Sequence, residues 1–195
     1  MKTKLWTIQD EKGWGKLQTK GILLPKEEFI PTGFKEGYDW MRTQMNKRIG
    51  DPNNTTQYPV WTWYQSSDAT KKKPDLRGSG HLPRGDVGYR IEIEKDQKDI
   101  LLSDFVLWHT PLSYRNYIAD SEEEAIDFEE KLGTIEFEKL PPSTRNKIEK
   151  SWEKVFDMSF DLEYYTLPFE EKAIQATFWE LKTDDIIKVD RFIAR

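Results

Sequence analysis

Apolar and polar residues alternate in several short stretches of the chain, which is the pattern of a β-strand with one buried face. The clearest stretch is YRIEIE at 89–94, where the alternation places Tyr89, Ile91 and Ile93 on the inward face. The same period predicts strands over LWTIQ at 5–9, YPVWTWYQ at 58–65, AIQATFWELK at 173–182 and KVDRFIAR at 188–195. The apolar run ILLSDFVLWH at 100–109 predicts a buried strand, or a strand that runs into a short turn.

Other stretches repeat their apolar residues every three or four positions, which predicts helices. One helix is expected to begin after Asp10 and to end at Gly21, because these residue types cap helices at those two ends. Further helices are predicted over residues 34–48, 121–133 and 144–157, the second of them opened by a capping box at Ser121 and Glu124. Strands and helices alternate without regular βαβ spacing. We therefore expect one compact α+β domain over residues 1–195, with a mixed, mostly antiparallel sheet and flanking helices.

The composition supports a compact domain and excludes several classes of function. Only 36 % of the 195 residues are hydrophobic, but 13 % are aromatic, and aromatic side chains bury large areas each. The chain has no cysteine and two histidines, which excludes disulfides and thiol nucleophiles, and no metal site is expected. No apolar segment is long enough for a signal peptide or a membrane span, so we expect a cytoplasmic protein without a membrane partner.

Charge is distributed unevenly along the chain. The formal net charge of −5 argues against extended coating of nucleic acid. The glycine-rich segment 66–88, however, is basic, and loops of this length tend to be functional or disordered. Its candidate donors for a phosphate-bearing ligand are Lys73, Arg77 and His81, together with Arg90 on the strand that follows. Asp75 is the acid placed to orient Arg77. The alternative interpretation is a mobile surface loop.

Two tryptophans and a glutamine share one face of the strand at 58–65. If the strand is regular, Trp61, Trp63 and Gln65 point to the same side. Paired indole faces stack planar rings, and an amide beside them reads the polar edge of such a ring. Gln9 and Gln175, on the first and penultimate strands, add two amides to this candidate ligand site. The alternative is that the indoles are core residues of a buried strand face.

Three further side chains are candidates for acid–base or ribose-binding chemistry. Asp104 and His109 form an acid–base pair if folding brings them together, although two such residues five positions apart are more often structural. Glu180, on the penultimate strand, is a candidate catalytic carboxylate. The sequence contains no P-loop and no GxSxG motif that would identify a reaction directly.

Six motifs distributed over the whole chain carry a resemblance to a known family. These motifs are LWTIQ, YPVWTWYQ, KPDLR, LLSDFVLWH, IQATFWELK and the C-terminal FIAR. With them the chain resembles, essentially from end to end, a bacterial family of single-domain proteins described as a domain of unknown function. This resemblance implies no activity.

A second, more distant resemblance is to ADP-ribosyltransferase-like folds. Those folds begin with a strand that carries a histidine and a threonine, and Thr7, Ile8 and Gln9 are similar in position, with a helix and a glycine following at matching spacing. They end with a strand whose catalytic Glu or Gln holds the ribose, and IQATFWELK is similar, with Gln175 in that place. The chain departs from the family pattern in having Thr7 and Gln9 for His and Thr, and Gln175 where glutamate is commoner.

The leading hypothesis is an enzyme-like domain that binds a nucleotide-type ligand through the indoles, the amides and the basic loop. The ADP-ribosyltransferase resemblance implies NAD as a cofactor and transfer of its ADP-ribosyl group, with Gln175 or Glu180 holding the ribose hydroxyl. One alternative is a non-catalytic module that binds nucleic acid or a peptide through an aromatic pocket. Another is a structural or antitoxin-like partner protein.

Overall fold

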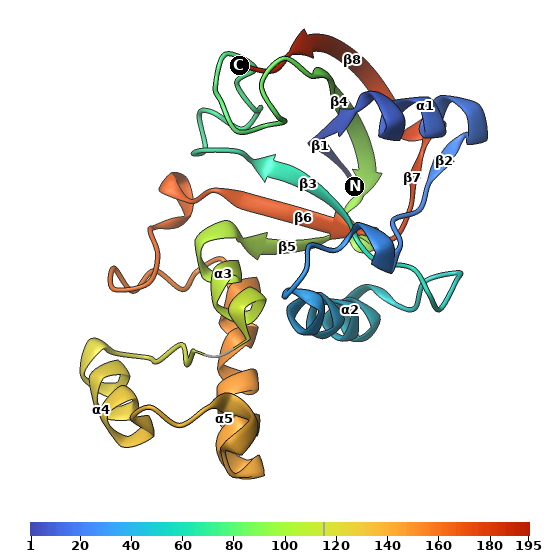
Figure 1. The fold of residues 1–195 in the computed structure, drawn as a ribbon. Helices are drawn as coiled ribbons and strands as arrows, with labels where there is room; N and C mark the ends of the chain where they lie inside the picture. Colours follow the sequence, from blue (N-terminus) through green and yellow to red (C-terminus); the bar gives the residue numbers. More distant parts are fainter. Residues whose placement is uncertain (115) are drawn as a thin grey trace.

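Six strands form one sheet in the computed structural model, which describes residues 1–114 and 116–195 (Figure 1). The strand order across the sheet is β5-β6-β3-β1-β4-β8, and each neighbouring pair is antiparallel. The strands are β1 (Lys2–Asp10), β3 (Val60–Gln65), β4 (Val87–Asp96), β5 (Leu101–Asp104), β6 (Ile174–Phe178) and β8 (Ile186–Ile193). A separate antiparallel pair consists of β2 (Ile22–Leu23) and β7 (Leu181–Lys182).

Helices cover both faces of this sheet. They are α1 (Glu11–Lys20), α2 (Lys35–Ile49), α3 (Phe105–Ser113), α4 (Glu122–Leu132) and α5 (Pro142–Ser151). Helix α1 packs on the face that carries Leu5 and Ile91, whereas α2, α3 and α5 build a second core around Trp108 against Trp61 on the other face. Figure 1 shows α4 and α5 at the end of the molecule farthest from β8. The predicted α+β architecture, a mostly antiparallel sheet with flanking helices, is confirmed.

The cap residues that the sequence predicts set the helix ends. The Asp10 carboxylate accepts a backbone N–H of the first turn of α1 at 2.6 Å, and Gly21, with a φ of 70°, ends the helix. Ser121 starts α4 by accepting the Glu124 N–H at 3.1 Å. Only this half of the predicted capping box forms, because the Glu124 carboxylate accepts from the N–H of Asp120 instead of returning to Ser121.

The apolar run at 100–109 differs from the prediction of a strand with a short turn. Strand β5 ends at Asp104, and the nine-residue helix α3 follows. The Asp104 carboxylate accepts the backbone N–H groups of Val106 at 2.9 Å and Leu107 at 3.1 Å, which makes it the N-cap of that helix. A capping aspartate therefore begins a helix where hydrophobicity alone predicts an extended chain.

The middle of the sheet is joined by a single residue pair. Strand β1 pairs with β4 along its whole length, but with β3 only through Trp6 and Trp63. On one side of that pair the two strands separate, and the Thr7 hydroxyl donates to the backbone carbonyl of Trp61 at 3.2 Å. The β1–β3 ladder therefore ends after this pair, and we call the opening between the two strands beyond it the strand gap.

A β-bulge in β3 changes the face on which Gln65 lies. Trp63 pairs with Gln175 on β6, but the next pair joins Gln65 to Ile174, so one residue of β3 is left over between them. Because the bulge shifts the alternation by one position, Gln65 lies on the face opposite Trp63 and is buried there. The prediction of a common face therefore holds for Trp61 and Trp63 and is wrong for Gln65.

Candidate functional site

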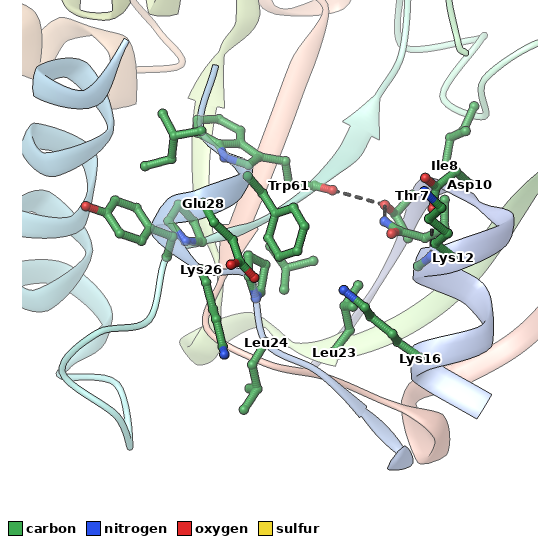
Figure 2. Close-up of a pocket in the computed structure, with 18 of the residues that line it drawn as sticks. Thr7, Ile8, Asp10, Lys12, Lys16, Leu23, Leu24, Lys26, Glu28 and Trp61 are labelled. Atoms are coloured by element: carbon green, nitrogen blue, oxygen red, sulfur yellow. Dashed lines mark hydrogen bonds between the residues drawn. The ribbon is translucent and has the colours of Figure 1, made fainter. Parts of the chain in front are cut away.

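A cavity of about 620 Å³ opens where β1 and β3 separate (Figure 2). Its walls come from residues 7–10 at the end of β1, one side of α1, the segment 22–30 and the start of β3. Tyr38 of α2 and Leu82 of the long loop after β3 complete the lining. A volume of this size is typical of small-molecule sites. We therefore treat this strand-gap cavity as the candidate functional site.

Gln9 is held in a defined orientation at the β1 end of the cavity. Its amide nitrogen donates to the Thr7 hydroxyl at 2.9 Å, and that hydroxyl donates in turn to the Trp61 carbonyl at 3.2 Å. The amide oxygen lies against α1, since a Cβ atom added to Gly13 would be only 2.7 Å from it. Gly13 therefore leaves the space that the Gln9 amide occupies, and the orientation of the amide is fixed.

Four of the residues that line the cavity are lysines: Lys12, Lys16, Lys20 and Lys26. The first three follow one another at intervals of four residues on α1, so they share one side of that helix. Figure 2 shows Lys16 reaching from α1 into the cavity, with Lys26 and Glu28 on the facing wall. The Lys16 ammonium lies 4.7 Å from the centroid of the Phe29 ring. No ion pair joins any of the four lysines to a carboxylate in residues 1–114 or 116–195.

Trp61 supplies an aromatic wall. Its ring centroid is 5.0 Å from that of Trp108 and 5.7 Å from that of Tyr38, so the helical core fixes the indole where it lines the cavity. The indole N–H is buried and has no hydrogen-bond partner among the described residues. An unpaired buried donor is unfavourable for the fold.

Tyr58, two residues before β3, is a second aromatic residue of the lining. Its hydroxyl donates to Asp39 at 2.6 Å, and Lys35 pairs with the same carboxylate at 2.6 Å. The Arg42 guanidinium lies 4.5 Å from the centroid of the Tyr58 ring. Burial, together with the bond to Asp39, raises the pKa of Tyr58, so the hydroxyl stays protonated at neutral pH. Tyr58 is therefore a fixed wall residue rather than a base.

The cavity brings together two of the five amide and indole residues predicted as ligand contacts, Gln9 and Trp61. Trp63 packs edge-on against Phe105 outside the cavity, with ring centroids 5.0 Å apart. Gln175, the cross-strand neighbour of Trp63, does not line the cavity either, and its amide oxygen is buried without a partner among the described residues. Trp63 and Gln175 therefore lie on the same sheet face as Trp61 but not in the same hollow.

The basic loop after β3 folds back onto β4 and β8. Arg90 donates to a backbone carbonyl of the loop and to Asp190 at 2.6 Å, and Lys73 lies 3.5 Å from the same carboxylate. The hydrogen bond from Arg90 lowers the pKa of Asp190 to about 2. Arg77 donates to both carboxylate oxygens of Asp75, the acid expected to orient it, and the shortest of these distances is 2.7 Å. Three of the five cations of this loop, Lys71, Lys73 and Arg77, therefore pair with acids of the chain itself. Leu82 is the residue of the loop that lines the cavity.

Both histidines and Asp104 contact groups outside the cavity. The Asp104 carboxylate caps α3 and pairs with the buried Lys172 at 2.7 Å. His109 does not reach it, because its Nδ1 lies 2.8 Å from the backbone carbonyl one turn earlier in α3. The Nε2 of His81 is likewise 2.8 Å from the carbonyl oxygen of Asp75. The acid–base pair of Asp104 and His109 is therefore not formed.

Glu180 has structural partners as well. Its carboxylate accepts from the side-chain amide of Asn53 at 2.7 Å and pairs with Lys182 at 3.1 Å. The bond from Asn53 lowers the pKa of Glu180 below its usual range. Glu180 thus ties the loop after α2 to the corner between β6 and β7, away from the cavity lining.

Within residues 1–114 and 116–195, no group of three or more acidic or histidine side chains is arranged to hold a metal ion. No helix in that part of the chain is long and apolar enough to cross a bilayer.

Residues 4–187 match the family described as Domain of unknown function (DUF3841). The chain belongs to this family. No curated protein and no solved structure matches the chain, so the activity of this DUF3841 protein has to be inferred from the site.

Sequence reasoning missed the lysines and tyrosines of the DUF3841 cavity. A signal was present for three of them, because Lys12, Lys16 and Lys20 repeat at intervals of four on a helix that the sequence predicts. No comparable signal existed for Lys26 or Tyr38. These two reach the cavity only because the segments that carry them pack around the gap in the sheet.

Proposed function

We propose that this DUF3841 protein binds a nucleotide-type small molecule in the strand-gap cavity. The observation that carries the proposal is the meeting, in one hollow of about 620 Å³, of the Trp61 indole, the oriented Gln9 amide and a set of lysines. A flat wall, a fixed donor–acceptor group and positive charge suit a ligand that combines a planar heterocycle with an anionic part.

Each part of such a ligand has a counterpart in the lining. Trp61 and Tyr38 form an aromatic wall for a ring. The Gln9 amide, held by Thr7, offers a second polar contact whose direction does not change on binding. Because these groups are already oriented by the protein, little ordering free energy is lost when the ligand enters.

The reaction class proposed with this ligand is transfer of the ADP-ribosyl group of NAD. What supports it is that Thr7, Ile8 and Gln9 line the cavity, as the resemblance of the first strand to ADP-ribosyltransferases implies. The bond between the nicotinamide nitrogen and ribose C1′ breaks, an acceptor oxygen or nitrogen bonds to C1′, and the acceptor proton passes to solvent as neutral nicotinamide leaves. Gln175 and Glu180 do not line the cavity, whose carboxylates are Asp10 and Glu28.

Calorimetric titration of the intact chain with NAD, ADP-ribose and AMP tests the binding proposal. We expect saturable heat with at least one of them, and about a 3–10-fold weaker affinity in Gln9→Ala, which loses one hydrogen bond. Gln18→Ala is the matched control, because Gln18 is an exposed amide of α1 outside the cavity lining. No heat with any of the three ligands at millimolar concentration would overturn the proposal.

Chromatographic measurement of nicotinamide released from NAD tests the reaction class separately. We expect time-dependent release with the wild-type protein and slower release with Gln9→Ala. Binding of NAD without any release, with acceptor proteins and nucleic acids supplied, would leave a nucleotide-binding module and remove the transferase proposal.

A further inference from the structure

We propose that Lys12, Lys16, Lys20 and Lys26 form a phosphate-binding rim and that the ligand of the cavity carries at least two phosphate groups, as a nucleoside diphosphate does. This proposal rests on the proposed function of the strand-gap cavity. It replaces the basic loop after β3 as the phosphate site, because the structure places these four lysines, and none of the loop's cations, in the lining.

The spacing on α1 suits a diphosphate. Residues four apart on a helix are about 6 Å apart along its axis, so two neighbouring lysines of the rim can reach adjacent phosphate groups with their flexible side chains. Lys26 approaches from the facing wall, which places ammonium groups on two sides of the opening (Figure 2). A single phosphate would engage only part of this rim.

The charge of the rim is available for a ligand. Two acids line the cavity against the four lysines, and one of them, Asp10, already accepts the Gly13 N–H at 2.6 Å as the N-cap of α1. No carboxylate of the described residues forms an ion pair with these ammonium groups. The Lys16 ammonium has one cation–π contact, with the Phe29 ring. Ammonium groups that have no carboxylate partner lose no internal ion pair when they bind phosphate.

The Phe29 ring keeps Lys16 directed toward the cavity. Phe29 is 59 % exposed, which is unusual for so large an apolar side chain, and the Lys16 ammonium lies over its face at 4.7 Å from the centroid. Figure 2 shows Lys16 extending from α1 across the opening. A cation that is already directed across the opening binds an anion with less loss of side-chain freedom.

The alternative interpretation is that these lysines are solvated surface residues without a ligand. The two interpretations differ in how affinity depends on phosphate number. A solvated face predicts equal affinity for adenosine, AMP and ADP. A phosphate-binding rim predicts that affinity rises with each phosphate and falls as salt screens the charges.

The test is calorimetric titration of adenosine, AMP and ADP into the wild-type chain and into the double variant Lys12→Met/Lys16→Met. We expect ADP to bind the wild type at least about tenfold more tightly than adenosine, and the double variant to lose about tenfold or more of its ADP affinity while adenosine affinity is unchanged. The matched control is Lys98→Met/Lys150→Met, which removes the same charge from two exposed lysines outside the cavity.

The outcomes separate this proposal from the one it rests on. Equal affinity for adenosine and ADP, or an ADP affinity that the Lys12→Met/Lys16→Met change leaves intact, would overturn the phosphate rim while the cavity remains a nucleoside site. An equal loss in the Lys98→Met/Lys150→Met control would show a general charge effect and would also overturn it. Absence of heat with all three ligands would overturn the rim, whereas the proposed function is overturned only if NAD and ADP-ribose also give no heat.

Discussion

Two basic regions of this DUF3841 protein differ in what their cations contact. In the segment 71–90 the sequence concentrates lysine and arginine, and the structure pairs four of these residues with acids: Lys71 with Asp68, Lys73 and Arg90 with Asp190, and Arg77 with Asp75. The four lysines around the strand-gap cavity have no such partners among the described residues. The segment that is more basic by composition therefore has less charge available for a ligand.

The difference shows that the acids brought in by the fold decide whether a cation is available. Asp190 lies on β8, one hundred positions from Arg90 in the chain, and β4–β8 pairing places the two side by side. Helix α1, in contrast, has its lysines on the side that faces the gap in the sheet. A paired cation stabilises the fold, whereas an unpaired cation at a cavity can serve binding.

The largest expected effect concerns the most buried paired cation of the chain, Lys172. Its ammonium is 2.7 Å from Asp104 and also donates to Thr166, and both charged side chains are 1 % exposed. Because Lys172→Met leaves the Asp104 charge buried and unpaired, we expect a loss of about 3–5 kcal/mol in the free energy of unfolding. Urea unfolding followed by tryptophan fluorescence measures it.

The control for this change is Lys71→Met, in which an exposed lysine paired only with Asp68 is removed; we expect about 0.5 kcal/mol or less. The double variant Lys172→Met/Asp104→Asn should recover part of the stability, because no buried charge is then unpaired. A loss below about 1 kcal/mol in Lys172→Met would contradict the view that paired cations stabilise the fold while unpaired cations at the cavity bind a ligand.

An intermediate effect is expected at the cavity from Gly13→Ala. The new Cβ would be 2.7 Å from the Gln9 amide oxygen, so the amide must move and ligand affinity should fall about 3–10-fold. The matched control is Gly15→Ala on the same helix, whose Cβ would meet no atom within 4 Å. That change should raise stability by up to about 1 kcal/mol through helix propensity and leave affinity unchanged. Equal affinities in the two variants would argue against a role for Gln9.

The smallest effect is expected when the pH is lowered and Asp190, which pairs with Arg90 and Lys73 of the basic segment, becomes protonated. The bond from Arg90 lowers the pKa of Asp190 to about 2, below its usual value of about 4. A carboxyl whose pKa is lower in the folded state stabilises the fold above pH 4 and loses that contribution as the pH falls toward 2. Asp190→Asn should flatten this part of the stability–pH curve without changing ADP affinity at pH 7. An unchanged curve would contradict the assignment.

The fold was largely predictable from the chain because its strong signals are local. Alternation gives the strands around Ile91, and the caps Asp10 and Gly21 give both ends of α1. The same local rules do not reveal the bulge that turns Gln65 to the opposite face, because nothing in YPVWTWYQ marks an inserted residue. Hydrophobicity also predicts extended chain after Asp104, where the capping aspartate begins a helix.

The candidate site was predictable only in part. Gln9 and Trp61 are at the cavity, as the polar and aromatic pattern of their strands suggests. Their meeting depends on the separation of β1 from β3 after the Trp6–Trp63 pair, and strand periodicity contains no information about pairing partners. Sequence reasoning missed the lysines for the same reason, because the folded chain decides which lysines have an ion-pair partner.

The most direct test of the strand-gap cavity is a ¹H–¹⁵N spectrum of the tryptophan indoles during titration with ADP-ribose, with Trp61 assigned through Trp61→Phe. The account predicts that the Trp61 indole resonance moves, because Trp61 lines the cavity in which the ligand binds. The resonance of Trp179, which donates to the Gly50 carbonyl at 2.7 Å, should stay in place. A stationary Trp61 resonance at millimolar ADP-ribose would contradict it.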